Sequence, residues 1–425
     1  MYNYSIIVSF LGAYNMIEHT NLANNIHITK IYEPKFKEVL INLKVVFELN
    51  DQQNTVANIL SRMMNDRTTA TPTKEQLQKR LDFMYGTKTS SNTYTAGKYQ
   101  VIDIAVKSIH AKFTDEPVQQ AQVDLLADMF YEVLINEETV NEAKDGLRLH
   151  HARIKESSAH YAQQQAFLNA APDSLFSVNS FGTLEAIETV TVEMVKDFHQ
   201  TLVEEAFKSI YIVGDLHDID VSRFNQGFSN NIETPLIYPE ITEKMMTQHH
   251  AGGQTEIVSL YATDIDPYHD LYAAYLVFVA YLGQLPSSLL FQNIREKHSL
   301  AYSIYASRQL FDGVMIIATG INDRNLDKTL TLIQEQFEIM KQESLDIQPA
   351  IQYLNLGLEG TTENLKRIAD RQFRNELLGV DESIEALQEK ITNVTVEQVK
   401  EVIGHLGAPF TYAYRAQGEG DNNHE

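Results

Sequence analysis

The chain has 425 residues, of which 44% are hydrophobic and 21% are charged, so a globular fold is expected and wholesale disorder, collagen and a coiled coil are excluded. Its 34 basic and 57 acidic residues give a formal net charge of −23, which offers no electrostatic reason to bind DNA or RNA. It contains no cysteine, which excludes disulfides, thiolate metal sites and cysteine nucleophiles. Its length predicts two or three domains.

Hydrophobic patterning predicts the same series of elements in each half of the chain, in the order strand, two helices, two strands, helix and a final strand. In the first half the predicted elements are a strand at 41–49, helices at 55–65 and 74–84, strands at 88–96 and 99–106, a helix at 118–135 and a strand at 209–214. In the second half they are a strand at 255–262, helices at 270–283 and 286–298, strands at 301–307 and 313–320, a helix at 325–342 and a strand at 410–414.

A sequence repeat supports this duplication. The segment VTVEMVKD at 190–197 recurs as VTVEQVKE at 394–401, and Thr191 and Thr395 are predicted helix N-caps. The predicted fold class is therefore α+β, with two homologous domains from an internal duplication, each an antiparallel-rich sheet with helices packed on one face. The predicted boundaries are an N-terminal domain at 1–225, a linker at 226–254, a C-terminal domain at 255–417 and a polar tail at 418–425.

The sequence shows neither a secretory signal nor a membrane span. The first basic residue is Lys30, so a positive leader region is missing, and no run of about 18 apolar residues occurs. We therefore expect a soluble cytoplasmic protein without membrane partners.

Common catalytic motifs are absent from the sequence. It has no G-x-S-x-G elbow, P-loop or dinucleotide fingerprint, and neither H-E-x-x-H nor H-x-x-E-H occurs among its 14 histidines. One pattern remains, LGQLPSSLLFQNIREKHSLAYS at 282–303, in which a Gly/Pro/Ser turn precedes a helix, a basic cluster and a strand.

This pattern resembles the second domain of the inverted-zincin peptidases, the group of pitrilysin, insulysin and mitochondrial processing peptidase. Their motif S-x-L-F-x-x-x-R-E-x-x-x-L-A-Y-S is followed closely by residues 287–303. The family is also built from duplicated α+β domains, and VGD at 213–215 is typical of the end of its first domain. The resemblance covers nearly the whole chain and implies this fold.

The zinc motif of active members is replaced here. The resemblance places Asn58 and Arg62 where two histidine ligands would stand, and Ser61 at the general base. His151, or His150 if the register slips by one residue, stands at the third ligand. Asparagine is a poor zinc ligand, arginine is a permanent cation and serine cannot serve as a carboxylate base, so no zinc is expected in this chain.

Arg295 and Tyr302 have the spacing of a pair that binds substrate in active relatives. The residues alone leave a plainer alternative open, in which Arg295 pairs with an acidic neighbour and Tyr302 packs beside a sheet edge. The resemblance implies that both side chains contact a peptide substrate.

Together these features resemble the non-catalytic half of bacterial paired peptidases. The resemblance implies a pseudo-peptidase subunit that forms a heterodimer with a zinc-bearing homologue, completes a peptide-processing chamber and has no cofactor of its own. Two other hypotheses are a stand-alone peptide-binding or scaffold homodimer without a proteolytic role, and an active peptidase with an unrecognised site. The absence of H-x-x-E-H disfavours the last of these.

Overall fold

The computed structural model describes residues 7–11, 15–215, 219–342 and 344–417, which form two compact units. The N-terminal unit contains the described residues within 1–150, 179–235 and 361–381. The C-terminal unit contains those within 151–178, 236–360 and 382–425. The predicted tail at 418–425 lies outside the described residues. Among the described helices, none combines the length and the apolar character needed to cross a membrane.

The sheet of the N-terminal unit has seven strands in the order β1-β2-β3-β7-β4-β6-β5. Only β3 and β7 pair in parallel, so the sheet is antiparallel-rich as predicted. The strands are β1 (Ile7–Leu11), β2 (Asn15–Asn21), β3 (His27–Tyr32), β4 (Glu38–Glu48), β5 (Lys88–Ala96), β6 (Tyr99–Ile109) and β7 (Phe207–Gly214).

Six helices of the N-terminal half accompany this sheet, and several bury their apolar stripes against one of its faces. On β4 this face is formed by Ile41, Leu43 and Val45, the alternating residues that predicted a buried strand. The helices are α1 (Asn54–Met64), α2 (Lys74–Phe83), α3 (Gln119–Tyr131), α4 (Glu137–Glu156), α6 (Leu184–Thr189) and α7 (Val192–Glu205).

The C-terminal unit repeats this design with five strands in the order β10-β11-β9-β12-β8. Its helices α8 to α10, α12 and α13 share one hydrophobic core. The strands are β8 (Lys244–His250), β9 (Thr255–Ala262), β10 (Ala301–Gln309), β11 (Val314–Ile321) and β12 (Phe410–Ala416). The helices are α8 (Tyr272–Gly283), α9 (Leu326–Gln342), α10 (Gln348–Glu359), α12 (Ile384–Thr392) and α13 (Val396–Glu401).

The strand orders confirm the internal duplication. The order β5-β6-β4-β7-β3 in the first sheet corresponds to β10-β11-β9-β12-β8 in the second, and the last pair is parallel in both. The predicted caps are also present. The hydroxyl of Thr191 accepts the Met194 amide and that of Thr395 accepts the Gln398 amide, each at 3.2 Å.

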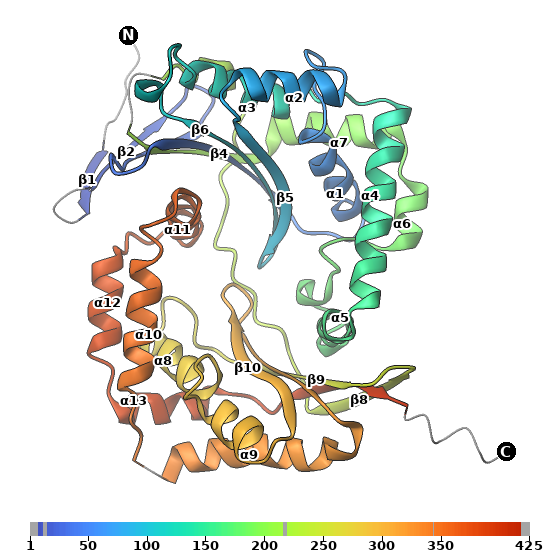
Figure 1. The fold of residues 1–425 in the computed structure, drawn as a ribbon, viewed down its shortest axis with the longest axis vertical. Coiled ribbons are helices and arrows are strands. Elements are labelled where there is room, and N and C mark those ends of the chain that lie inside the picture. Colours follow the sequence, from blue (N-terminus) through green and yellow to red (C-terminus); the bar gives the residue numbers. More distant parts are fainter. Residues whose placement is uncertain (1–6, 12–14, 216–218, 343, 418–425) are drawn as a thin grey trace. The chain divides into compact units, whose positions relative to one another are not determined.

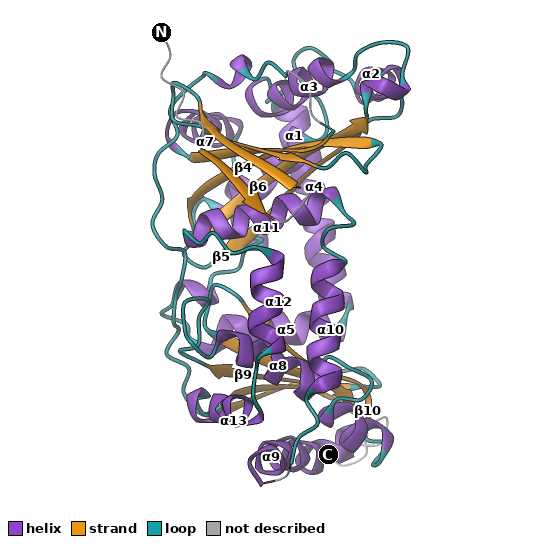
Figure 2. Cartoon of the chain, turned by 90° about the vertical axis from the view of Figure 1, so that its left-hand side faces the viewer, coloured by secondary structure: helices purple, strands orange, loops and turns teal. Residues whose placement is uncertain are grey.

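Each half of the chain places one helix in the unit built mainly by the other half. Helix α5 (Ser158–Ala170) packs on β9 and β12 of the second sheet, and α11 (Leu365–Leu378) packs on β4 and β7 of the first. Figure 1 shows α11 and α3 on opposite faces of the first sheet, and the view in Figure 2 agrees. The compact units are therefore interleaved along the chain.

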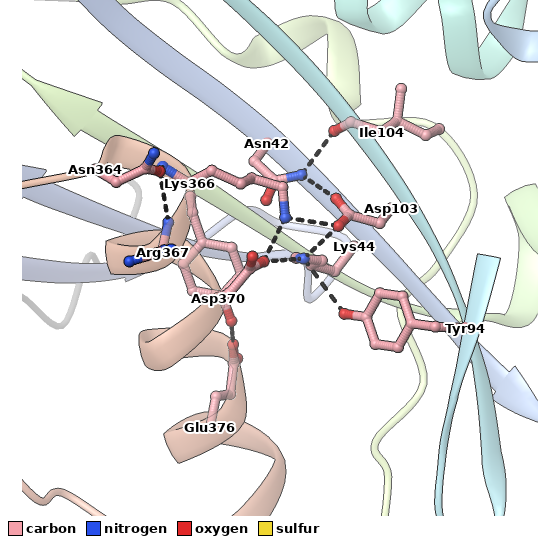
Figure 3. A network of polar contacts seen from close by, with 11 residues as sticks. Asn42, Lys44, Tyr94, Asp103, Ile104, Asn364, Lys366, Arg367, Asp370 and Glu376 are labelled. Carbon is pink, nitrogen blue, oxygen red and sulfur yellow. Dashed lines mark hydrogen bonds and ion pairs between the residues drawn. The ribbon is translucent and has the colours of Figure 1, made fainter. Parts of the chain in front are cut away.

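A buried charge network fastens α11 to the first sheet (Figure 3). The Lys44 ammonium, with its side chain fully buried, lies 2.8 Å from an Asp103 oxygen and 2.6 Å from an Asp370 oxygen. Lys366 of α11 binds the same two carboxylates, at 2.7 Å from Asp103. Burial opposes the charge on Lys44, but the two aspartates outweigh it and raise the pKa of the lysine.

Sequence and structure differ in several places. Strands β1, β2 and β3 lie in a region where no element was predicted, and β8 lies within the predicted linker at 226–254, where it pairs in parallel with β12. The helix expected at 286–298 contains instead a π-helical turn, Phe291–Glu296. Asn42 and Lys44 on the second face of β4 are fully buried, because α11 covers a face for which no covering helix was predicted.

Candidate functional site

Asn58, which the resemblance places at the first zinc-ligand position, lies on α1 and forms hydrogen bonds with neighbouring residues. Its amide nitrogen donates to the carbonyl oxygens of Asn54 and Ser180, at 2.8 and 2.7 Å, and its amide oxygen accepts the Thr93 hydroxyl at 2.5 Å. The residue is only 4% exposed. Its hydrogen-bonding groups therefore tie α1 to strand β5 and to the loop before α6.

Ser61 and Arg62 complete the replaced motif. The Ser61 hydroxyl lies 2.8 Å from that of Ser91 on β5. The half-buried Arg62 lies across Gly146 of α4, where an added Cβ would stand 3.5 Å from the guanidinium. Burial lowers the pKa of Arg62, and within the described residues no carboxylate pairs with it. A guanidinium and two hydrogen-bonded neutral groups do not fit Zn²⁺, so no metal chemistry is assigned here.

The histidines of α4 contribute packing. The His150 ring lies 4.2 Å from the Phe181 ring, centroid to centroid, in a tilted arrangement. His151 follows on the same helix and is half-buried. Neither observation supplies the three ligands that a catalytic zinc ion requires.

Arg295 lies in the π-helical turn of the C-terminal unit, a type of turn that is frequent at functional sites. Its guanidinium stacks over the Phe291 ring at 4.6 Å, and its nearest carboxylate among the described residues is Glu296 at 3.9 Å. The side chain is 43% exposed. Stacking fixes the guanidinium plane while most of its N–H groups stay available.

A left-handed residue connects this turn to the next strand. Ser299 has φ of +51°, and its amide closes the turn by donating to the Arg295 carbonyl at 3.0 Å. A serine in this conformation is uncommon, and such backbone positions cluster at functional sites. The bend fixes where the strand that carries Tyr302 begins.

Tyr302 lies at an irregularity of β10, which is an edge strand of its sheet. The pairing of β10 with β11 skips this residue, passing from Ala301 to Ser303. The Tyr302 ring is 64% exposed and Tyr305 is 41% exposed. Tyr302 is therefore largely exposed on the edge strand of this sheet.

A second polar cluster, formed by Asp264, His269 and His405 in the C-terminal unit, was not predicted from the sequence. His405 follows His269 by 136 residues, so no spacing rule joins the two. The only local signal was an aspartate and a histidine five residues apart after a predicted strand, which is too common to indicate a site.

Comparison with known proteins identifies the lineage of the fold. Residues 189–348, which include the π-helical turn, Arg295 and Tyr302, match the family described as peptidase M16 inactive domain. Over these residues the chain is similar to an inactive-type M16 domain. The resemblance to the inverted-zincin peptidases, which form this family, is thereby confirmed.

Two proteins from Bacillus subtilis are similar to this chain over nearly its whole length. The "probable inactive metalloprotease YmfF" is 24% identical over 391 residues, covering 88% of this chain and 91% of the relative. The "uncharacterized zinc protease YmxG" is 21% identical over 425 residues, covering 94% and 97%. The similarity to these relatives thus extends over both units.

Solved structures share the fold. A conserved protein from Enterococcus faecalis has a TM-score of 0.85 and 24% identity, with 93% of this chain and 97% of that chain covered. A peptidase M16 inactive domain from Pseudomonas fluorescens has a TM-score of 0.79 and 18% identity, with 95% and 98% covered. These similarities confirm the predicted α+β, two-domain fold class.

Proposed function

We propose that this M16 homologue is a non-catalytic peptidase subunit that pairs with a zinc-bearing homologue and contributes Arg295 and Tyr302 to a peptide-processing chamber. One contrast carries the proposal. Asn58 and Ser61, which the resemblance places at the zinc site, form hydrogen bonds within the chain. Arg295 and Tyr302, by contrast, are exposed. The chain has lost the groups that bind metal and keeps the groups that would bind substrate.

The chemistry of the pair suits this role. A guanidinium that is stacked on one face presents N–H donors at its edge, which can bind peptide carbonyls or a substrate carboxylate. A tyrosine hydroxyl can donate a hydrogen bond to an oxyanion that forms on the scissile carbonyl. The catalytic zinc and its water would come from the partner, so no step of hydrolysis belongs to this chain alone.

The relatives give the proposal a context. Bacillus subtilis has a homologue named as a probable inactive metalloprotease and another named as a zinc protease. Two such chains in one organism would provide the non-catalytic and the zinc-bearing member of a pair. The net charge of −23 would favour the attraction of basic peptides into a shared chamber.

The test is reconstitution. The untagged chain and its nearest zinc-bearing homologue are purified separately, and cleavage of a quenched basic peptide is followed with each chain and with the mixture. We expect turnover only in the mixture. Tyr302→Phe should lower kcat by about a hundredfold, as expected for loss of one oxyanion donor, and Arg295→Ala should mainly raise KM.

Matched controls are available in the chain. Arg153 is an exposed arginine on α4 and Tyr353 is an exposed tyrosine on α10, so Arg153→Ala and Tyr353→Phe should leave turnover unchanged. Cleavage by the chain alone would overturn the proposal. Peptide binding by a homodimer that the zinc-bearing chain neither joins nor alters would instead establish a stand-alone binding protein.

A further inference from the structure

Three potential metal ligands meet in the C-terminal unit. The ligand atoms of Asp264, His269 and His405 all lie within 4.8 Å of one another. The His405 Nδ1 atom is 2.8 Å from an Asp264 carboxylate oxygen, and the two imidazole rings are 5.1 Å apart, centroid to centroid, at 74°. Donors on one ion are separated by at most about 4.2 Å, twice a typical Zn–N distance, so only small side-chain movements would bring these together.

The backbone holds the two segments that carry these residues in place. Asp264 follows Thr263, which forms a β-bridge with Leu406, and the Gly407 amide donates to the Ala262 carbonyl at 2.9 Å. His405 is thereby fixed beside the end of β9 by main-chain contacts that do not depend on any ion. Such preorganisation reduces the entropy that metal binding must overcome.

The protonation of His405 and Asp264 bears on metal binding. The His405 Nδ1 atom and the Asp264 carboxylate face each other across one hydrogen bond. An ion bound by both groups would take the place of the proton between them, because ligating side chains are deprotonated when a metal binds. At His269 the Nδ1 atom accepts the Leu271 amide at 3.0 Å. Metal binding at Nδ1 would displace that hydrogen bond, whereas binding at Nε2 would leave it in place.

A pocket adjoins the cluster. It has a volume of about 300 Å³ and is lined by His269 together with Tyr268, Asp270, Lys390 and Asn393, among others. His269 thus belongs to both the cluster and the pocket. An ion held by three protein groups keeps at least one coordination position open, and water or a small ligand in this pocket could reach it.

We propose that Asp264, His269 and His405 form a binding site for a transition-metal ion of the Zn²⁺ or Co²⁺ type. Two imidazoles and one carboxylate select such ions over Ca²⁺ and Mg²⁺, which prefer all-oxygen sites. The site lies in the C-terminal unit and shares no residue with the replaced H-x-x-E-H positions on α1. It therefore does not depend on the proposed peptidase pairing.

The experiment measures metal binding by the untagged full-length protein. After removal of metal with a chelator, the protein is dialysed against Co²⁺ or Zn²⁺, and bound metal and the Co²⁺ ligand-field spectrum are recorded. We expect one equivalent and a spectrum with nitrogen ligands. His405→Ala and His269→Asn should each weaken binding at least tenfold, and His269→Asn keeps an acceptor for the Leu271 amide.

His249→Ala, which removes an exposed histidine of β8, is the control and should bind metal as the unchanged protein does. Circular dichroism of each variant establishes that it is folded, and a site variant that does not fold is replaced by Asp264→Asn. The proposal is overturned if the unchanged protein retains no metal above the buffer level. It is equally overturned if folded site variants retain as much metal as the control.

Discussion

At the scale of single residues, the replaced zinc motif is more than a set of missing ligands. Asn58 joins α1 to Thr93 and Ser180, and Ser61 joins it to Ser91. Each of these partners would lose a hydrogen bond if histidine or glutamate were put back, and a buried unsatisfied polar group costs about 1–3 kcal/mol. Asn58 and Ser61 are therefore tied into the local structure of the N-terminal unit by these hydrogen bonds.

A second residue, Asp312, makes stability depend on pH. It lies half-buried in the turn between β10 and β11, and burial raises its pKa to about 6, against about 3.9 in an unfolded chain. The folded form therefore keeps a proton that the unfolded form releases, so this group's contribution to stability falls as pH rises from about 4 to about 6. We expect Asp312→Asn to raise the free energy of unfolding by about 2 kcal/mol near neutral pH and to remove this slope.

Urea denaturation followed by circular dichroism near pH 4.5 and near pH 7 measures this effect. Asp51→Asn, at an exposed aspartate, serves as the control. If the two variants changed the free energy of unfolding by the same amount at both pH values, burial would not destabilise the charged Asp312 carboxylate.

At the scale of elements, local pattern predicted most of the structure. The strands at 88–96 and 255–262 have the predicted ends, because β-branched and aromatic residues bounded by glycine turns are local signals. The polar β8 carries no such signal and was missed, since it forms only by pairing with β12. The burial of Lys44 could not be predicted, because it depends on a helix more than 300 residues away in the chain.

Separation along the chain also decided which candidate site could be predicted from the sequence. Arg295 and Tyr302 lie in one continuous motif, which sequence alone could recognise. The Asp264, His269 and His405 cluster depends on the β-bridge between Thr263 and Leu406, which no local pattern encodes.

The docking of α11 gives a prediction about Lys44. Lys44→Met would leave Asp103 buried with Lys366 as its only remaining lysine partner, and breaking a buried ion pair typically costs about 3–5 kcal/mol. We expect a lower Tm and faster amide hydrogen exchange in α11. The double variant Lys44→Met with Asp370→Asn should recover part of the loss, because it removes a charge of each sign.

Lys390→Met is the matched control, since this lysine is 65% exposed and forms a surface pair with Glu382. If it destabilised the protein as much as Lys44→Met, the special role of the buried network would be refuted.

At the scale of the whole molecule, α5 of the first half lies in the C-terminal unit and α11 of the second half lies in the N-terminal unit. This exchange of helices makes each unit dependent on both halves of the chain. A fragment of residues 1–225 contains the first sheet without α11, so the buried face around Lys44 stays uncovered. We expect this fragment to lack a cooperative unfolding transition. Co-expression of 1–235 with 236–425 should restore a soluble complex, because all elements of both units are then present.

Thermal unfolding by circular dichroism and size-exclusion chromatography measure both outcomes. Cooperative unfolding of the 1–225 fragment alone would show that α11 is dispensable for the first unit.

The exchange of α11 also sets an order of events on the ribosome. The last strand of the first sheet ends at Gly214, and α11 ends 164 residues later at Leu378. At a synthesis rate of about 5–20 residues per second, α11 is completed on the order of ten seconds after the last strand of the sheet. The waiting face carries Asn42, Lys44 and Asp103. Water can solvate these polar groups in the interval, which protects the exposed sheet from aggregation while synthesis continues.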